Sequence, residues 1–122
     1  MKRLARYAAV GGAATAAHYA LLALAVEAWH WPAWLASGAG ALLGAQVAFW
    51  ANRHYTFAHR GPWLPAWWRF HLTAGAGALL GMGLVAAGVH AGLHYLLAQA
   101  GATLIVMGAS FLANRAWTFR RA

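Results

Sequence analysis

The sequence predicts an all-α membrane protein in which four transmembrane helices form two helical hairpins within one transmembrane domain, residues 1–122. Composition is the first observation: 63% of the 122 residues are apolar and only 8% are charged, against about 45–50% and about 25% in soluble domains. A soluble domain this small would need more charge to cover its surface. The second observation is that the apolar residues form uninterrupted runs of about 20 residues, the length that crosses the hydrocarbon core. The third is that all the basic residues precede the first run, lie between the second and third runs, or follow the fourth. Four membrane crossings would place these segments on the same side of the membrane.

The first predicted span covers residues 7–26. It carries no charged residue and follows a basic start with Lys2, Arg3 and Arg6. A basic start before an apolar run is also typical of a signal peptide, but this run is too long for the apolar region of one. We therefore expect the run to be a transmembrane helix.

Three further spans follow, at residues 33–51, 70–89 and 95–113. The runs are continuous rather than alternating, so they predict helices and not barrel strands. The short segments 27–32 and 90–94 are predicted hairpin tips. The segment 52–69 between the two pairs of spans is longer.

Tryptophan is concentrated in that longer segment. Trp63, Trp67 and Trp68 have a spacing that predicts one face of a short helix lying in the membrane interface. We interpret these residues as a depth anchor of the kind found in aromatic belts. A surface that docks a partner protein is the alternative.

The basic residues predict the orientation in the membrane. The hairpin tips hold none of them, and the sole acid, Glu27, lies in the first tip. The positive-inside rule then places both termini and the segment between the pairs in the cytoplasm. The net charge of +8 is read as this topology signal and as attraction to lipid phosphates, not as a sign of nucleic-acid binding. The nine residues are Lys2, Arg3, Arg6, Arg53, Arg60, Arg69, Arg115, Arg120 and Arg121.

An internal repeat divides the chain. The pattern F-x-A-N-R-x-aromatic-T-F occurs at residues 49–57 and again at 111–119. We predict repeat one over 6–57, a cytoplasmic loop at 58–68 and repeat two over 69–119. Because each repeat holds two spans, both have the same orientation and are related by an axis along the membrane normal.

The repeated motif supplies groups that suit a phosphate. Its amide, guanidinium and hydroxyl all donate hydrogen bonds, and the guanidinium forms a bidentate fork. Capping by Asn and snorkelling by Arg are the simpler interpretation of one copy, but the duplication favours binding. The predicted lipid-phosphate and sugar site comprises Arg6, Asn52, Arg53, Thr56, Arg69, Asn114, Arg115 and Thr118.

Three other polar residues define a predicted translocation path for the sugar: His18, Gln46 and Glu27. Gln46 is mid-span, where we expect it to hydrogen-bond across helices. His18 is also mid-span and is interpreted as a neutral packed imidazole rather than a proton-sensitive group. Glu27 lies at a span end, where hydration is available, so an exposed carboxylate is expected there.

Glycine pairs four residues apart occur in the spans, at Gly40 and Gly44, Gly77 and Gly81, and Gly88 and Gly92. In lipid, small residues let helix backbones approach and gain van der Waals contact. We predict helix packing at these pairs. A smooth seam that admits a lipid tail is the functional alternative.

Catalytic and metal chemistry are not expected. The chain has no Cys and a single acid, which leaves no thiolate and no pair of carboxylates. His90 and His94 have a spacing that metals can use, but no further ligand joins them. We therefore expect neither an enzyme nor a cofactor.

The chain is similar to the GtrA-like family. The similarity is carried by Arg-Tyr-x-x-Val-Gly-Gly at 6–12, by the four spans and by the two Asn-Arg-x-x-Thr-Phe segments. It implies a multi-pass protein of the bacterial cytoplasmic membrane that translocates polyprenyl-phosphate-linked sugar, or polyprenyl phosphate, for cell-surface polysaccharide synthesis or glycosylation. The implied partners are this lipid and a membrane glycosyltransferase.

Two alternatives remain. One is a non-transporting subunit that docks and positions a polyprenyl-phosphate glycosyltransferase. The other, less favoured, is a small multidrug-type transporter, which would need an acid inside a span, whereas Glu27 lies at the edge of one. Four spans enclose little volume, which is compatible with a homo-oligomer.

The orientation is testable by cysteine labelling, since the chain has no native Cys. We expect Ala28→Cys and Ala91→Cys to react with an impermeant thiol reagent added to intact cells, because both tips lie outside. Ala58→Cys should react only after the cells are opened. The reversed pattern would contradict the predicted orientation.

Overall fold

The computed structural model describes residues 2–56 and 63–113, which form four α-helices: α1 (Lys2–Glu27), α2 (Ala33–Ala51), α3 (Trp63–His90) and α4 (Tyr95–Ala113). A π-helical segment, η1 (Asn52–Thr56), continues α2. These residues contain no strand. The predicted all-helical class is therefore confirmed for the described part of the chain.

Three segments are long and apolar enough to cross a membrane: Leu4–Glu27, Ala33–His54 and Leu64–His90. A shorter apolar stretch, Tyr95–Ala109, lies in α4. The helices coincide in position with the four predicted spans. By length and composition the chain is a multi-pass membrane protein.

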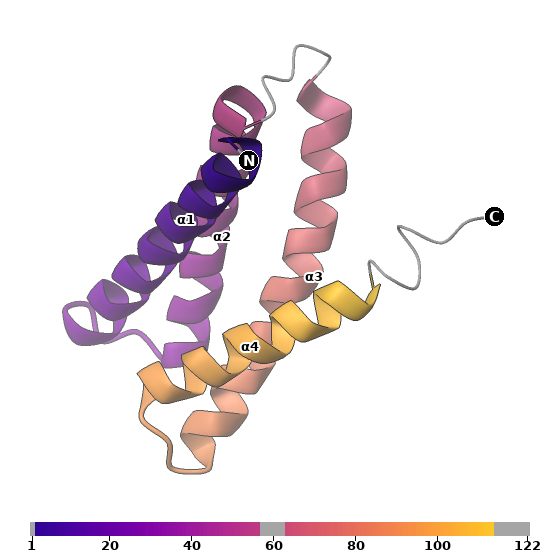
Figure 1. Ribbon diagram of the computed structural model, residues 1–122. Coiled ribbons are helices and arrows are strands. Elements are labelled where there is room, and N and C mark those ends of the chain that lie inside the picture. The colour runs from indigo at the N-terminus through magenta and orange to yellow at the C-terminus, as the bar shows by residue number, and fades with distance from the viewer. Residues whose placement is uncertain (1, 57–62, 114–122) are drawn as a thin grey trace.

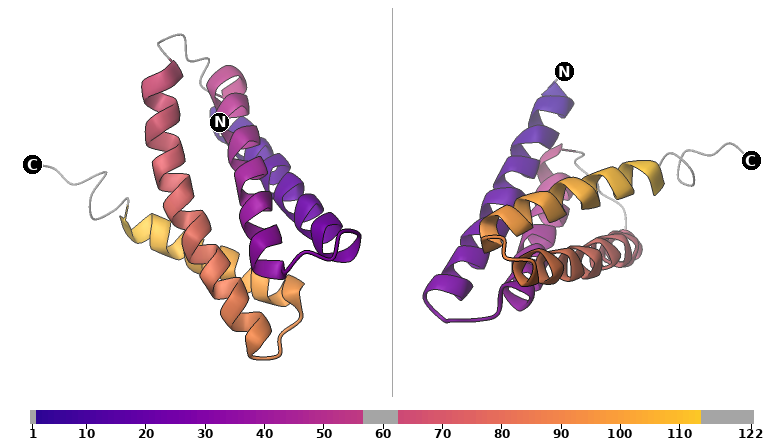
Figure 2. Two further views of the ribbon diagram at one scale, coloured as in Figure 1. Left: turned by 180° about the vertical axis from the view of Figure 1, so that it is seen from behind. Right: turned by 90° about the horizontal axis from the view of Figure 1, so that it is seen from below.

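The helices form a bundle with one oblique member. Figure 1 shows α2 between α1 and α3, while α4 crosses in front of α3 at an angle. Both helix-to-helix turns lie at one end, called here the hairpin end; α1 begins and η1 lies at the other, called here the N-terminal end. Helices α1 and α2 stay close along their lengths, whereas α3 and α4 diverge from their turn (Figure 2). The two-fold repeat stays a prediction, since residues 114–119 lie outside the described part.

Two glycines allow the close approach of α2 to α1. A Cβ atom added to Gly40 would lie 2.5 Å from both Cδ2 and the carbonyl oxygen of His18, and one added to Gly44 would lie 2.9 Å from the carbonyl oxygen of Ala14. A real Cβ atom could not lie so close to these neighbours, so the two helices can approach this closely only because glycine has no side chain. The predicted packing role of this glycine pair is confirmed.

Small residues also line the contact between α3 and α4. A Cβ atom on Gly88 would lie 2.8 Å from Cβ of Ala98. One on Gly77 would lie 3.3 Å from Cγ1 of Val106, and one on Gly81 would lie 3.8 Å from Cγ2 of the same valine. The predicted packing role therefore also holds for Gly77 and Gly81. The distances there are longer than those at Gly40 and Gly44 between α1 and α2.

Gly92 does not pair with Gly88 as predicted. Helix α3 ends at His90, and Gly92 lies in the following turn with φ 99°. This left-handed conformation suits glycine because it has no Cβ atom. Gly88 therefore serves packing, whereas Gly92 serves the turn.

The predicted interfacial helix is not a separate element. Helix α3 begins at Trp63 and already includes Trp67 and Trp68. Pro65 is tolerated there because the first-turn N–H groups have no helical acceptor. Trp67 stacks on His71 with ring centroids 4.1 Å apart, while Trp68 is exposed. The rings of Trp67 and Trp68 are also in T-shaped contact, with centroids 5.3 Å apart. These two side chains therefore lie together, and a face shared with Trp63 stays a prediction.

A pair of glycine substitutions tests the packing of α1 on α2. Gly40→Ala should lower the free energy of unfolding by about 1–3 kcal/mol, because the new methyl group meets a backbone carbonyl that cannot shift. Gly11→Ala is the matched control, since nothing lies within 4 Å of its Cβ position, and it should be neutral or stabilising by up to about 1 kcal/mol. Thermal unfolding in detergent micelles measures both. Equal effects would contradict the packing role.

Candidate functional site

A central cavity of about 540 Å³ lies between the four helices. Small residues form most of its wall, among them Ala14 of α1, Gly44 of α2, Gly77 of α3 and Ala102 of α4. The volume falls within the range of about 300–1,000 Å³ that is typical of small-molecule sites. The small side chains therefore leave ligand-sized space inside the bundle.

Neutral polar side chains from three helices face this space. No Asp, Glu, Lys or Arg is found among the described residues that line it. Such groups can hydrogen-bond hydroxyls at a lower desolvation cost than ions would pay. The polar lining includes Thr15, His18, Thr73, Gln99 and Thr103.

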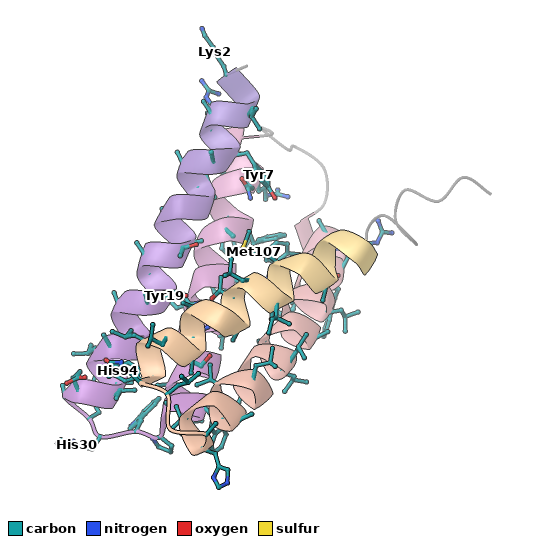
Figure 3. All side chains as sticks on the ribbon, turned by 60° about the horizontal axis from the view of Figure 1, so that its bottom comes forward. Lys2, Tyr7, Tyr19, His30, His94 and Met107 are labelled. Carbon is teal, nitrogen blue, oxygen red and sulfur yellow. The ribbon has the colours of Figure 1, made fainter. Side chains whose placement is uncertain are left out.

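A hydrogen-bond network, called here the α4 network, joins α4 to α1 and α2. The Ser37 hydroxyl donates to Oε1 of Gln99 at 2.5 Å, and both residues are 2% exposed. Nε2 of Gln99 donates to Oγ1 of Thr103 at 3.3 Å, and Oγ1 of Thr103 lies 2.8 Å from the Tyr19 hydroxyl. Figure 3 shows Tyr19 on α1 beside α4. Gln99 was missed in the sequence, although it is a mid-span amide like Gln46.

His18 borders the central cavity next to this network. Its ring packs edge-on to Tyr19, with centroids 5.3 Å apart, and it occupies the space that a side chain at Gly40 would need. The imidazole is therefore packed, as predicted. Its Nε2 atom is buried and has no hydrogen-bond partner within the described residues.

A second cavity of about 410 Å³ lies at the N-terminal end and is lined in part by Asn52 and Arg53. Arg53 is half-buried. This Arg53 cavity and the central cavity share Tyr7, Ala48 and Phe70 in their linings, so the two adjoin. Tyr7 is visible near the start of α1 in Figure 3. A basic mouth thus leads to a neutral polar interior.

Asn52 begins the π-helical segment. Its φ of −66° and ψ of −40° are right-handed, and its N–H points to the carbonyl oxygens of Ala48 and Phe49. The left-handed cap with which many helices end is therefore not formed at Asn52. The irregular turn carries Asn52 and Arg53 past the end of α2, and π-helical turns are frequent at functional sites.

Arg6 and Arg69, two further residues of the predicted phosphate site, are not among the described residues that line the Arg53 cavity. Arg6 and Arg69 are exposed, and the Arg69 carbonyl oxygen accepts a bond of 3.1 Å from the Thr73 hydroxyl. Joining of the two motif copies into one site stays a prediction. The groups outside the described side chains are Thr56, Asn114, Arg115 and Thr118.

Gln46 bonds across helices, as predicted. Its Nε2 lies 2.6 Å from Nε2 of His71, and Nδ1 of His71 lies 2.9 Å from the carbonyl oxygen of Trp67. Since a carbonyl oxygen only accepts, Nδ1 carries the proton and Gln46 donates to Nε2. This bond ties α2 to α3.

Glu27 is exposed at the end of α1, as predicted. The Tyr95 hydroxyl donates to its Oε1 at 2.9 Å, which ties α1 to the start of α4. Of the three predicted path residues, His18 is the one that the described lining of the central cavity includes. A path through Gln46 and Glu27 stays a prediction.

The fold and the cavities define a polytopic helical membrane protein with a neutral polar interior and a basic mouth. The transmembrane domain family described as GtrA/DPMS matches residues 6–121, so the chain belongs to this family, and the resemblance seen in the sequence is confirmed. Membership indicates a membrane protein of polysaccharide or glycolipid synthesis. Neither the curated proteins nor the solved structures compared with the chain gave a match.

A double-mutant cycle tests the α4 network. Tyr19→Phe and Thr103→Val each remove one member of a bonded pair, and we expect a coupling free energy of about 0.6–1.7 kcal/mol, the range for such bonds in membrane proteins. Unfolding in detergent measures it. Tyr19→Phe combined with Thr73→Val, which removes a hydroxyl bonded elsewhere, should be additive. Additivity in both cycles would contradict the network.

Proposed function

We propose that this protein moves polyprenyl-phosphate-linked sugar, or polyprenyl phosphate, across the bacterial cytoplasmic membrane for cell-surface polysaccharide synthesis or glycosylation. The observation that carries the proposal is that the Arg53 cavity adjoins the central cavity through shared lining residues. A lipid phosphate needs a cation, and a sugar needs neutral hydrogen-bonding groups. The Arg53 cavity supplies the cation, and the adjoining central cavity supplies the neutral hydrogen-bonding groups.

Arg53 is the proposed phosphate contact. A guanidinium binds phosphate oxygens through two parallel charge-assisted hydrogen bonds. Because Arg53 is half-buried, its attraction for an anion is less screened than that of an exposed residue. Asn52 adds a neutral donor to the same cavity. The second motif copy, Asn114 and Arg115, is proposed to complete the site.

The lipid tail is proposed to leave the interior between α2 and α3. A third cavity, of about 630 Å³, has an apolar lining apart from His71. It shares four alanines with the central cavity, so only small side chains separate the interior from this face. These residues are Ala41, Ala45, Ala74 and Ala78.

The proposed movement is downhill. The chain has a single acidic residue, and that residue, Glu27, is exposed and bonded to Tyr95 at the hairpin end. Glu27 therefore does not supply a carboxylate inside the bundle that could bind and release protons. Consumption of the sugar on the far side would drive net transport.

A non-transporting subunit that positions a membrane glycosyltransferase is the second candidate. It is supported by an exposed apolar stripe on the first turns of α3, where Leu64, Trp68 and Leu72 are 49%, 56% and 69% exposed. Residues four apart lie on one helix face, so they form a surface on which a partner helix could pack. The multidrug-type transporter is less favoured, because Glu27 is exposed at the end of its helix.

Vesicle reconstitution tests the proposed transport. We expect a fluorescent polyprenyl-phosphate sugar to equilibrate between the two leaflets without ATP or a proton gradient. Vesicles that hold Gln46→Leu should equilibrate more slowly, because the variant removes a polar group of the predicted translocation path. Preparations that bind the lipid yet move none of it would favour the docking subunit instead.

Arg53 substitutions test the phosphate contact. Arg53→Ala should weaken polyprenyl-phosphate binding by about 1.5–3 kcal/mol, the value of a hydrogen bond to a charged group. Arg53→Lys should restore binding only in part, since a point charge lacks the fork. Lys2→Ala, which removes an exposed charge at the start of α1, is the control and should bind normally. Full rescue by lysine would indicate a topology anchor.

A further inference from the structure

We propose that the polar floor of the central cavity, defined by His18, Gln99 and Thr103, is a separate binding station for an uncharged, hydroxyl-bearing head group. This inference rests on the proposed function, and it adds the chemical class of the head group and the residues that bind it. All three floor residues line the central cavity. The α4 network holds Gln99 and Thr103 in place, and His18 is packed against Tyr19, so the floor is arranged before a ligand arrives.

The floor has hydrogen-bonding capacity that its own network does not use. Nε2 of His18 is buried and has no partner within the described residues. A buried polar atom without a bond is costly, and in native proteins it frequently indicates a missing ligand or water. A ligand hydroxyl could donate to Nε2 of His18.

The lining also restricts the charge of the ligand. No acidic or permanently basic side chain lies among the described residues around the central cavity. An ammonium or carboxylate group on the head group would lose its hydration there without gaining a counter-ion, which costs more than neutral hydrogen bonds return. A neutral hydroxyl loses far less. The station therefore favours a neutral sugar over an amino sugar or a uronic acid.

The floor is distinct from the Arg53 cavity. Tyr7 lines both cavities. At a rise of about 1.5 Å per residue, His18 lies about 16 Å further along α1 than Tyr7. One monosaccharide cannot bridge that distance while its phosphate stays at Arg53. The head group would thus reach the floor as a second step, and the floor should bind a neutral glycoside that carries no phosphate.

Protection of a single cysteine tests this station in nanodiscs. Ala14→Cys places a thiol in the cavity wall one helical turn before His18, and the chain has no native Cys. We expect methyl glucoside to slow alkylation of this thiol, while methyl glucuronide and the methyl glycoside of glucosamine do not. Ala91→Cys, in the exposed turn at the hairpin end, is the control site and should not be protected.

Substitutions of His18 show whether binding at the floor causes the protection of the thiol. In the Ala14→Cys background, His18→Phe should raise the glucoside concentration for half-protection about tenfold, which corresponds to about 1.4 kcal/mol. His18→Gln should restore most of the protection, because an amide still bonds a hydroxyl. His90→Phe is the matched control, since His90 is exposed at the end of α3.

Three results would overturn the inference: equal protection by charged and neutral glycosides, equal protection at Ala91→Cys, or protection unchanged in both His18 variants. Binding of polyprenyl phosphate without a sugar is measured in the same nanodiscs and reports on the proposed phosphate site, not on the floor. If that lipid fails to bind while the glucoside protects, the proposed function fails and the neutral station stands. If the lipid binds and no glycoside protects, the station fails by itself.

Discussion

The arrangement of the bundle depends on the rule that a polar group in hydrocarbon must find its partner within the protein. Helix α4 packs on α3 near their turn, where Gly88 meets Ala98, and diverges from α3 further along (Figure 2). The bonds from Ser37 to Gln99 and from Tyr19 to Thr103 also tie it to α2 and α1. Breaking either bond would leave a polar group unsatisfied, which makes the crossing angle of α4 specific.

The two hairpins use small residues to different effect. At Gly40 and Gly44 the backbones of α1 and α2 are in direct contact, and little space remains between them. At Gly77 and Gly81 the neighbours are the γ-methyl groups of Val106, at longer distances, and these two glycines, like Gly44, line the central cavity. A closely packed hairpin and a diverging one, joined by polar bonds, leave a ligand-sized space where four equally packed helices would leave none.

The sequence predicted the apolar parts of the fold well, because apolar runs mark the hydrocarbon core directly. The bounds of α2 and α4 agree with the predicted spans. Helices α1 and α3 begin earlier, at Lys2 and Trp63, since hydropathy shows where the membrane ends and not where a helix does. The cross-helix bond of Gln46 was predicted, but its partner His71 was not, because a single span does not reveal which faces meet. Ser37 and Gln99 were missed for the same reason.

The distribution of charge explains how such a small chain could handle an anionic lipid. In the proposed function, positive charge at the N-terminal end would both orient the helices and attract phosphate, so Arg53 would serve two purposes at one position. An ion within the central cavity would have to be desolvated during every passage, and the described lining contains none. With Glu27 held at the hairpin end by Tyr95, the proposed station would distinguish ligands by hydrogen bonding, while the proposed phosphate contact at Arg53 would distinguish them by charge.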